Sequence, residues 1–381
     1  MEQTLTLVCK LQPTPEQVAK IEATLKAFAD ACNYANEQVK PQITSKTTIQ
    51  NMVYQDLRSK FDLSANLAVR ACARVGANRK TAKAKGKPVK TFKPTSADYD
   101  ARIFAFREKD WSASLTLNGG REHIKLKSAN YQMGKLKGRC PTSAQLCKHK
   151  DGLYYLHIQL TDIAPEPIKS GKVIGVDFGR RDIAVTSSGD KWDGKQIKET
   201  RDRFSRVRAS LQRKGTKGAK RALKRLSGRE RKYQTWLNHT ISRAIIADAK
   251  AKNAIVAIEN LTGIRERTNS KPRNKIERRH SNSWGFYQLR VFLEYKGIQS
   301  GVEVIAVPPA YTSQTCHQCL HIGLRSDKVF KCGNCSWHGD ADFNAANVIS
   351  LLGGAFVSLP ERSVLACSLS EPQARAKAPR L

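Results

Sequence analysis

Acidic residues are scarce in this chain of 381 residues. It contains 33 aspartate and glutamate residues against 67 lysine and arginine residues, so its formal net charge is +34. Positive charge on this scale attracts polyanions and raises the concentration of phosphate groups near the protein surface. The composition therefore indicates a polyanionic partner, and any carboxylate placed inside this field becomes a candidate functional group.

Long apolar runs are also absent. The longest apolar stretches fall short of the roughly 18 to 20 residues that span a bilayer, and the first nine residues lack the basic start and apolar core of a signal peptide. We therefore expect a soluble, cytoplasmic protein without a membrane partner. Hydrophobic residues still make up 40% of the chain, so buried cores can form, and the length predicts two or three domains.

The ten cysteines do not have the distribution of a secreted disulfide scaffold. Six are scattered along the chain: Cys9, Cys32, Cys72, Cys140, Cys147 and Cys367. The other four form two CxxC pairs within twenty residues: Cys316, Cys319, Cys332 and Cys335. Such pairs indicate one tetrahedral, structural Zn²⁺ in a reducing compartment, and four thiolates leave no open position for catalysis. We expect the nearby histidines to be surface residues: His317, His321 and His338.

The first 165 residues combine strand and helix patterns. Residues 3 to 11 alternate like a strand, and Thr14, Pro15 and Gln17 are typical of a helix start. Apolar spacings predict that helix and a second helical segment from about residue 47 to 75. Further strands are expected at 103–106, 112–117, 123–126 and 154–160. Residues 1–11 and 81–165 are thus predicted to form a small β-barrel or sheet, and residues 12–80 a helical insert. Residues 79–93 hold seven basic residues and no acid, which favours a loop that contacts phosphates.

A linker at residues 163–170 precedes a half that alternates strand and helix. Strands are expected at 173–177, 182–187, 195–199, 254–259 and 303–307, and helices at 201–251, 283–299 and 343–352. This order predicts a mixed α/β sheet over residues 171–310 and 340–352, interrupted by the cysteine segment at 311–339. Residues 353–381 have no sustained period and are expected to be a mobile, disordered tail.

Three acids stand in distinct contexts in this half. Asp177 and Glu259 each end an apolar run, and Asp342 lies where the last helix is expected to begin. Each has an ordinary alternative. Asp177 can end a strand in a turn or belong to an actin-like nucleotide site, Glu259 can be exposed beyond the core, and either Asp342 or Asp340 can cap the helix. We expect Gly175 and Gly179 to let a substrate or metal approach the backbone closely.

The combination of these acids is more informative than any one of them. Asp177, Glu259 and Asp342 would supply the hard oxygen ligands that Mg²⁺ prefers, shared between two ions roughly 4 Å apart, as in two-metal hydrolysis of phosphodiesters. Binding phosphate alone requires no acids.

Two basic segments accompany the acids. Fourteen lysine and arginine residues and two acids lie between residues 201 and 232, an imbalance that favours a nucleic-acid duplex lying along this helix over a solvated charged helix. Residues 265–280 combine basic residues with proline, asparagine and serine. This second segment is expected to form a flexible flap beside the acids.

Several motifs together resemble those of a known family. Val176-Asp177-Phe178-Gly179, Ile258-Glu259-Asn260-Leu261 and the segment from Asp340 to Asn347, preceded by the four cysteines, look like the three RuvC motifs and the zinc element of TnpB proteins. The segments 283–286, 293–296 and 311–316 are also similar to that family, and the likeness covers most of residues 1–350. Leu320 and Ser336 depart from it, because glycine often follows each CxxC pair there.

The resemblance implies a transposon-associated, RNA-guided DNA endonuclease related to compact type V CRISPR effectors. It implies a multidomain α+β protein in which an RNase H-like RuvC domain with a zinc ribbon accompanies a wedge-type β-barrel that carries the helical recognition insert. Asp342 rather than Asp340 would be the third catalytic acid. Guide RNA and target double-stranded DNA would be the partners of a chain that we expect to act as a monomer. A nuclease-silent RNA-guided repressor, a DNA transposase and an actin-like ATPase remain the alternatives.

Overall fold

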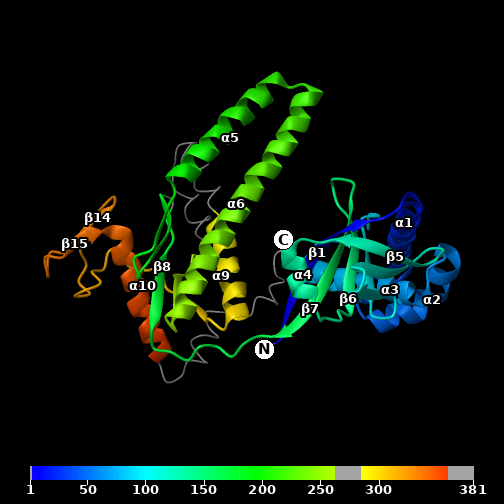
Figure 1. Ribbon diagram of the computed structural model, residues 1–381, viewed down its shortest axis with the longest axis horizontal. Helices are drawn as coiled ribbons and strands as arrows, with labels where there is room; N and C mark the ends of the chain where they lie inside the picture. The colour runs from blue at the N-terminus through cyan, green and yellow to red at the C-terminus, as the bar shows by residue number, and fades with distance from the viewer. Residues whose placement is uncertain (1, 180, 262–284, 359–381) are drawn as a thin grey trace. The chain divides into compact units, whose positions relative to one another are not determined.

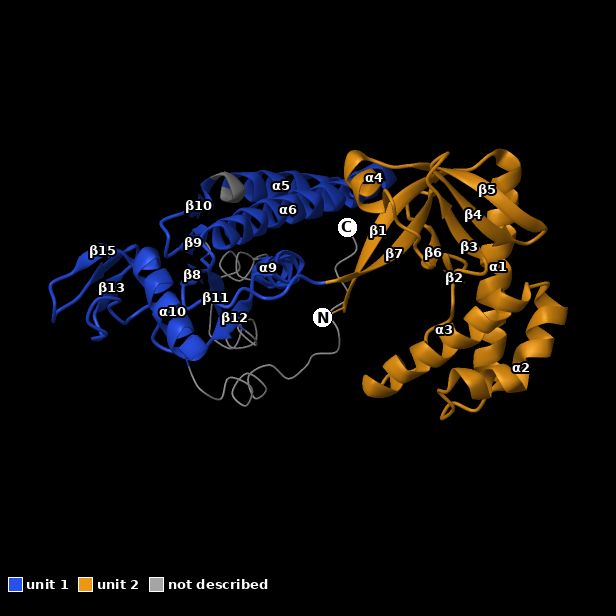
Figure 2. Ribbon diagram, turned by 60° about the horizontal axis from the view of Figure 1, so that its bottom comes forward, with its two compact units in different colours: residues 1, 164–375 blue, residues 2–163, 376–381 orange. Residues whose placement is uncertain are grey.

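The computed structural model describes residues 2–179, 181–261 and 285–358. The expected flap at 265–280, Trp284 of the family-like segment, Cys367 and the tail beyond residue 358 lie outside these residues. The chain divides into two compact units, one formed by residues 2–163 and the other beginning at residue 164 (Figure 2). Each unit has its own hydrophobic core.

A curled antiparallel sheet forms most of the first unit. Its seven strands follow the order β2-β6-β7-β1-β5-β4-β3. The tyrosine hydroxyl of Tyr99 on β2 donates to the carbonyl of Thr116 on β4 at 3.1 Å, so the two edges of the sheet approach each other and the barrel is nearly closed. The strands are β1 (Glu2–Gln12), β2 (Ser96–Asp100), β3 (Phe104–Arg107), β4 (Ser112–Leu117), β5 (Gly120–Lys127), β6 (Ser143–Lys148) and β7 (Tyr154–Ile163). Strands β2 and β6 have no counterpart among the expected strands.

Three helices share one hydrophobic core with this barrel: α1 (Pro15–Gln38), α2 (Lys46–Phe61) and α3 (Ala65–Ala84). The predicted start of α1 is confirmed, since Thr14 and Gln17 form a capping box and Pro15 opens the helix. The single helix expected over residues 47–75 is wrong. Asp62 adopts a left-handed conformation, with φ of 48°, and ends α2 there. A short helix, α4 (Asn130–Leu136), was also not expected.

Arg79 corrects the interpretation of the basic segment 79–93. This arginine lies in α3 and is buried. Its guanidinium makes five hydrogen bonds to acceptors at and after the end of α1: the side chain and carbonyl of Asn36 and the carbonyls of Val39, Lys40 and Ile43. It thereby satisfies carbonyls that the helix end leaves without partners. Arg79 is therefore structural, and the loop begins only after Ala84.

The second unit is built on a mixed five-stranded sheet of order β10-β9-β8-β11-β12. Strands β8, β11 and β12 run parallel, whereas β9 and β10 run antiparallel to their neighbours. The strands are β8 (Val173–Asp177), β9 (Asp182–Thr186), β10 (Lys191–Asp193), β11 (Ile255–Glu259) and β12 (Val304–Val307). The strand expected at 195–199 is wrong, because the Asp193 carboxylate accepts the N–H of Lys195 at 2.8 Å and a helix begins at that residue.

Helices cover both faces of this sheet (Figure 1). The helix expected over 201–251 is instead two antiparallel helices, α5 (Lys195–Lys214) and α6 (Lys217–Ala251). Gly215, with φ of 65°, ends α5, and Thr216 caps α6. Helix α6 packs with α9 (Phe286–Ser300) on the face formed by Ile174, Val176, Val256 and Ile258. Helix α10 (Ala341–Ser358) packs on the opposite face, against Ala257 and Val307.

Two glycines bring α10 unusually close to the sheet. A Cβ atom on Gly175 of β8 would lie 2.0 Å from the carbonyl oxygen of Ala346 and 2.4 Å from the amide nitrogen of Ser350. A Cβ on Gly353 would lie 2.7 Å from the side chain of Ala257. The expectation that Gly175 admits a substrate is therefore wrong, because α10 fills that space. Gly353 to Ser358 also belong to α10 and not to a tail.

Gly175→Ala tests this close packing. We expect a loss of about 1–3 kcal/mol of stability, the usual range for overpacking, because the new methyl group meets backbone atoms that cannot rotate away. Gly171→Ala is the matched control, since no atom lies within 4 Å of its added Cβ. Thermal unfolding measures both variants, and equal melting temperatures for the two would contradict the analysis.

Candidate functional site

The fold brings two of the predicted acids to one edge of the sheet. In the parallel pair β8–β11, Val176 lies opposite Ile258. Asp177 and Glu259 are the next residues of the two strands, so they lie side by side at the carboxyl ends of β8 and β11. This edge is where open α/β sheets usually place their ligands. The third acid, Asp342, lies in the first turn of α10, which packs on β8.

Asp340, not Asp342, caps α10. Its Oδ1 atom accepts the N–H groups of Asp342 at 2.8 Å and of Phe343 at 3.1 Å. The sequence had left open whether Asp340 or Asp342 caps the helix. Because Asp340 is the cap, the carboxylate of Asp342 is not used for capping. That carboxylate is buried, with 5% of its side chain exposed, and it points towards the sheet edge near Gly179.

The three carboxylates interact electrostatically. Burial raises the pKa of Asp177 to about 8, and the neighbouring carboxylates of Glu259 and Asp342 add to this effect, whereas Arg325 and Lys328 oppose it. Burial also raises the pKa of Glu259, against the effects of a hydrogen bond from the buried Thr312 hydroxyl and of Arg325. Gathered, buried carboxylates of this kind have a strong requirement for a compensating cation.

Two basic side chains meet part of that requirement. The Arg325 guanidinium donates to Asp342 Oδ1 at 2.7 Å, and the Lys328 ammonium contacts Asp342 Oδ2. Both come from a hairpin of β13 (Leu324–Ser326) and β14 (Val329–Lys331). A metal site needs ligand atoms that lie close together. Among the described residues, such a group, with all ligand atoms within 4.8 Å of one another, is formed by the four cysteines. The carboxylate oxygens of Asp177, Glu259 and Asp342 do not all lie this close together. In this arrangement Asp342 is held by Arg325 and Lys328.

The donor set nevertheless fits Mg²⁺. Three carboxylates supply hard oxygen ligands at the edge where the parallel strands end, and the partly buried Asp177 has two acids as neighbours. Asp177 and Glu259 have no ion pair among the residues that the structure describes. A divalent cation at this position would offset both the burial and the repulsion between carboxylates that raise the pKa of Asp177.

Sequence reasoning missed four residues of this site: Asp182, Thr312, Arg325 and Lys328. Their partners are distant along the chain, as in the ion pair of Lys328 with Asp182 at 2.5 Å, and no local pattern marks them. Thr312 lies in a segment that is similar to the family, but its role follows only from its bond to Glu259. At Gly179 the space expected for a substrate or metal is partly filled by the chain itself, because an added Cβ would lie 2.4 Å from the carbonyl oxygen of Asp182.

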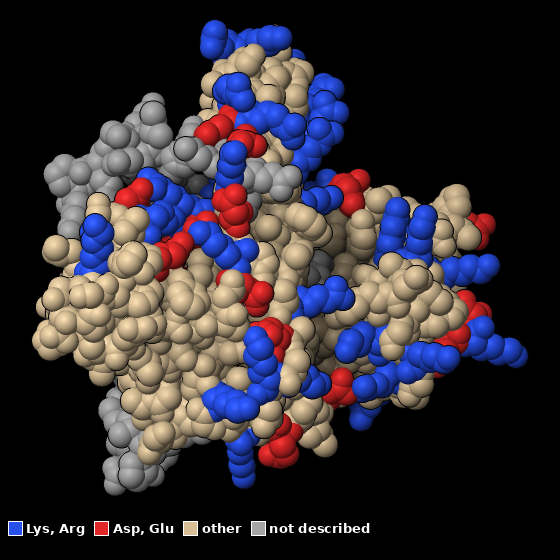
Figure 3. Space-filling model, turned by 60° about the vertical axis from the view of Figure 1, so that its left-hand side comes forward, with Lys and Arg blue, Asp and Glu red and all other residues tan. Residues whose placement is uncertain are grey.

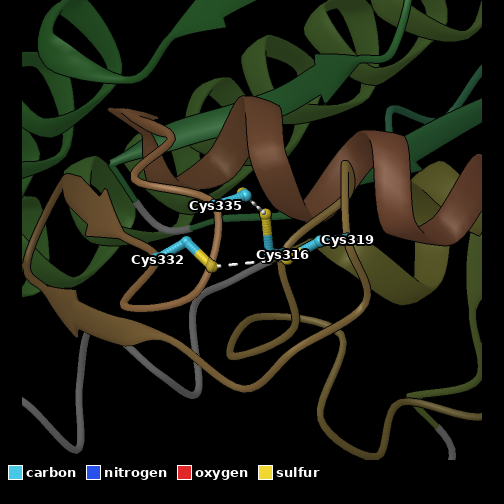
Figure 4. Close-up of side chains that lie close together, drawn as sticks. All are labelled: Cys316, Cys319, Cys332 and Cys335. Carbon is cyan, nitrogen blue, oxygen red and sulfur yellow. Dashed lines mark hydrogen bonds between the residues drawn. The ribbon is translucent and has the colours of Figure 1, made fainter.

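The cysteines form the predicted cluster beside this site (Figure 4). The Sγ atoms of Cys316 and Cys335 are 3.6 Å apart, and those of Cys319 and Cys332 are 3.5 Å apart. Sulfurs bound to one tetrahedral Zn²⁺ at about 2.3 Å would be about 3.8 Å apart, so the four residues fit that ion. Of the neighbouring histidines, His321 and His338 are exposed as expected. His317 instead bonds to Asn344.

The cysteine segment leads directly into α10. Strand β15 (His338–Asp340) pairs with β14, and the N–H of Ala341 donates to the carbonyl of Lys328 at 2.8 Å. Ala341 also packs in the small core that contains Cys316 and Phe330. These direct contacts connect the cysteine segment to the first turn of α10, which carries Asp342.

The basic helices present a cationic surface. Lysine and arginine side chains crowd the tip of the α5–α6 hairpin at the top of Figure 3. Some basic residues are engaged within the hairpin, since Arg208 pairs with Glu230 and Arg201 donates to Gln234. The others leave an excess of positive charge along two helices, which suits the phosphates of a nucleic acid.

The raised pKa of Asp177 predicts how metal binding depends on pH. Below about pH 8 the metal-free protein holds a proton on Asp177, which a metal must displace. We expect the affinity for Mn²⁺ or Mg²⁺ to rise between about pH 6 and pH 8, with release of about one proton. Calorimetric titration in buffers of different ionisation enthalpy measures both quantities. Affinity that stays constant from pH 6 to pH 9 would contradict the assignment. Because folding raises the pKa of Asp177, the metal-free folded protein binds one more proton than the unfolded chain below that pKa. Its free energy of unfolding should therefore fall as the pH rises towards the pKa of Asp177.

Two strained residues in the cysteine segment give a second prediction. Leu320 and Ser336 have φ values of 61° and 59°, the left-handed conformation that disfavours side chains, and both are exposed. We expect Leu320→Gly and Ser336→Gly each to stabilise the zinc-loaded protein by about 0.5–1 kcal/mol. Melting temperatures with zinc measure this effect, with Gln318→Gly as the control at an exposed position outside that conformation. A destabilised glycine variant would refute the analysis.

Comparisons with known proteins agree with this geometry. The family model of the Cas12f1-like TNB domain matches residues 286–349, which span α9, β12, the cysteine segment and the first half of α10. A TnpB-like protein of Methanocaldococcus jannaschii is 35% identical over 214 residues, which cover 51% of this chain and 75% of that protein. The CRISPR-associated endodeoxyribonuclease Cas12f1 of Sulfoacidibacillus thermotolerans is 30% identical over 57% of this chain, which spans only 54% of that relative.

The fold has a solved counterpart. The protein in a cryo-EM structure of a Cas12f1–sgRNA–target DNA complex aligns with 88% of this chain and 83% of its own, with a TM-score of 0.66 and 15% identity. None of the helices in the described parts of the chain has the length and apolar content needed to cross a membrane. The extent of the match to the archaeal relative is decisive: this chain belongs to the TnpB family, which is related to the compact Cas12f effectors.

Proposed function

We propose that this protein is an RNA-guided, Mg²⁺-dependent DNA endonuclease of the RuvC type whose catalytic acids are Asp177, Glu259 and Asp342. One observation carries the proposal: three carboxylates from β8, β11 and α10, that of Asp342 buried and those of Asp177 and Glu259 partly exposed, interact at one sheet edge, in a chain of net charge +34. Relatives of this chain are named CRISPR-associated endodeoxyribonucleases.

The topology of the sheet supports the RNase H-like assignment. In chain order, its strands lie as third, second, first, fourth and fifth. The first three are antiparallel and the last two run parallel to the first. Asp177 therefore ends the central strand β8, and Glu259 ends its parallel neighbour β11. Asp342 lies on α10, which packs against these strands.

Each residue of the site has a defined task in phosphodiester hydrolysis. Asp177, Glu259 and Asp342 would hold two Mg²⁺ ions, which activate the attacking water and stabilise the leaving oxygen. Thr312 orients Glu259 through its hydroxyl, and Asp340 holds the first turn of α10 so that the carboxylate of Asp342 stays turned to the site. Partial burial of Asp177 reduces the screening of these charges by bulk water.

The basic surfaces would bind the nucleic acids. We assign the α5–α6 hairpin and the loop after Ala84 to the guide RNA and its heteroduplex with target DNA, recognised by backbone shape while base pairing reads the sequence. The barrel and helices α1 to α3 would recognise a short motif next to the target. Zinc would be structural, and the protein would act as a monomer.

Asp177→Ala tests the catalytic assignment. We expect cleavage of a plasmid target to fall by at least about a thousandfold, because the central acid of the site is lost, while binding of the co-purified RNA is retained. Asp190→Ala is the matched control, since this exposed aspartate lies in the same unit outside the site. Undiminished cleavage by the Asp177→Ala variant would falsify the assignment.

The same assay separates the alternatives. Wild-type protein that binds the target with its RNA but leaves it intact in Mg²⁺ would be a nuclease-silent repressor. Activity that survives removal of the RNA by ribonuclease would indicate a transposase that acts on DNA ends. Cleavage that requires both the RNA and Mg²⁺ supports the proposed function.

A further inference from the structure

A lysine from the zinc-binding segment lies between two carboxylates at the site. The Nζ atom of Lys328 is 2.5 Å from Asp182 Oδ2 and also contacts Asp342 Oδ2. Both acids are almost fully buried, with 7% and 5% of their side chains exposed. The lysine therefore occupies space beside the third catalytic acid that a metal ion bound to Asp342 Oδ2 would need.

Asp182 belongs to a chain of ion pairs that continues beyond the site. Lys191 on β10 pairs with Asp182 at 2.9 Å and with Asp340 at 3.2 Å, and Asp340 caps α10. Asp182 thus pairs with two lysines, both through its Oδ2 atom. It is the first residue of β9 and lies within the same sheet as Asp177, so its carboxylate is fixed relative to the catalytic acids.

The hairpin that carries Lys328 has anchors that do not depend on this lysine. Asp327 at its tip pairs with Arg181, and the carbonyl of Lys328 accepts the N–H of Ala341. The cysteine cluster holds the base of the same segment. The backbone at residue 328 is therefore held in place, and only the flexible lysine side chain needs to move to free the Oδ2 atom of Asp342, while Arg325 keeps its contact with Oδ1.

We propose that Lys328 is a tethered counter-ion of the catalytic centre, which a divalent metal displaces from Asp342, and that Asp182 is the positioning residue that keeps the displaced ammonium beside the site. The inference rests on the proposed function. It adds that the metal-free centre contains its own cation and that metal binding is a competition with it.

The physical argument concerns unpaired charge. A lysine ammonium and a divalent cation repel each other and cannot both bind one carboxylate oxygen at close range. Removing a cation from a buried carboxylate is costly unless another cation replaces it. Here the incoming metal would replace the ammonium at Asp342, while Asp182 still pairs with Lys328. Neither Asp182 nor Asp342 is left without a cation in either state.

Binding of Mn²⁺ to the full chain tests this exchange, with zinc loaded and nucleic acid removed. Calorimetry and the Mn²⁺ electron paramagnetic resonance signal give the affinity without reference to cleavage. The Mn²⁺ binding that is lost in Asp177→Ala is the binding at the acidic centre. The two variants Lys328→Gln and Asp182→Asn then change the competition in opposite directions, which loss of structure alone cannot do.

We expect Lys328→Gln to bind Mn²⁺ about threefold to tenfold more tightly, because the metal no longer displaces a partly buried ion-pair partner. Asp182→Asn should bind Mn²⁺ more weakly, since the displaced ammonium loses its carboxylate and stays on Asp342. The double variant should resemble Lys328→Gln. Lys331→Gln, on β14 of the same hairpin and without an ion pair among the described residues, controls for the loss of one positive charge.

The outcomes separate the inference from the proposed function. Wild-type protein whose Mn²⁺ binding is the same as that of Asp177→Ala would overturn both. Normal binding at the centre with an unchanged or weaker affinity in Lys328→Gln would overturn the inference alone. Lys328→Met serves as a second variant should the glutamine variant fold poorly, with zinc content and melting temperature as the checks.

Discussion

Repulsion between buried carboxylates is the constraint around which the second unit is organised. Asp177, Glu259 and Asp342 come from three elements and meet where solvent is largely excluded, so desolvation and mutual repulsion raise the pKa of Asp177 to about 8. A fold keeps such a group of acids only if cations are supplied. Arg325 and Lys328 supply them from within the chain, and they come from the one segment whose cysteines are arranged for zinc.

The zinc-binding segment therefore has two structural effects on the site. Its strands β14 and β15 lead into α10 and fix where that helix begins, which sets the position of Asp342. Its hairpin also carries the two cations that contact the same acid. Because four thiolates close the zinc site, the metal there acts on the acids only through this geometry. The glycine contacts at Gly175 and Gly353 complete the arrangement by letting α10 lie against β8 and β11.

Much of the fold followed from local pattern. The spans of β4, β8 and β11 and the capped start of α1 were predicted to within one residue, because apolar alternation and a capping box are local signals. Errors occurred where the local signal was ambiguous. The break at Asp62 and the turn at Gly215 lie inside continuous helical patterns, and Arg79 resembled its basic neighbours although five acceptors surround its guanidinium.

The sequence by itself determined the chemistry available to this protein: the excess of positive charge, the four-cysteine cluster and the identity of the three acids. These are properties of residue type and spacing, so they can be recognised without coordinates. Only the tertiary structure decided which aspartate caps α10, which cations hold Asp342, and that Gly175 serves helix packing. Asp182 and Lys328 are 146 residues apart in the chain, and their 2.5 Å contact depends on how β9 and the hairpin pack, which local sequence does not encode.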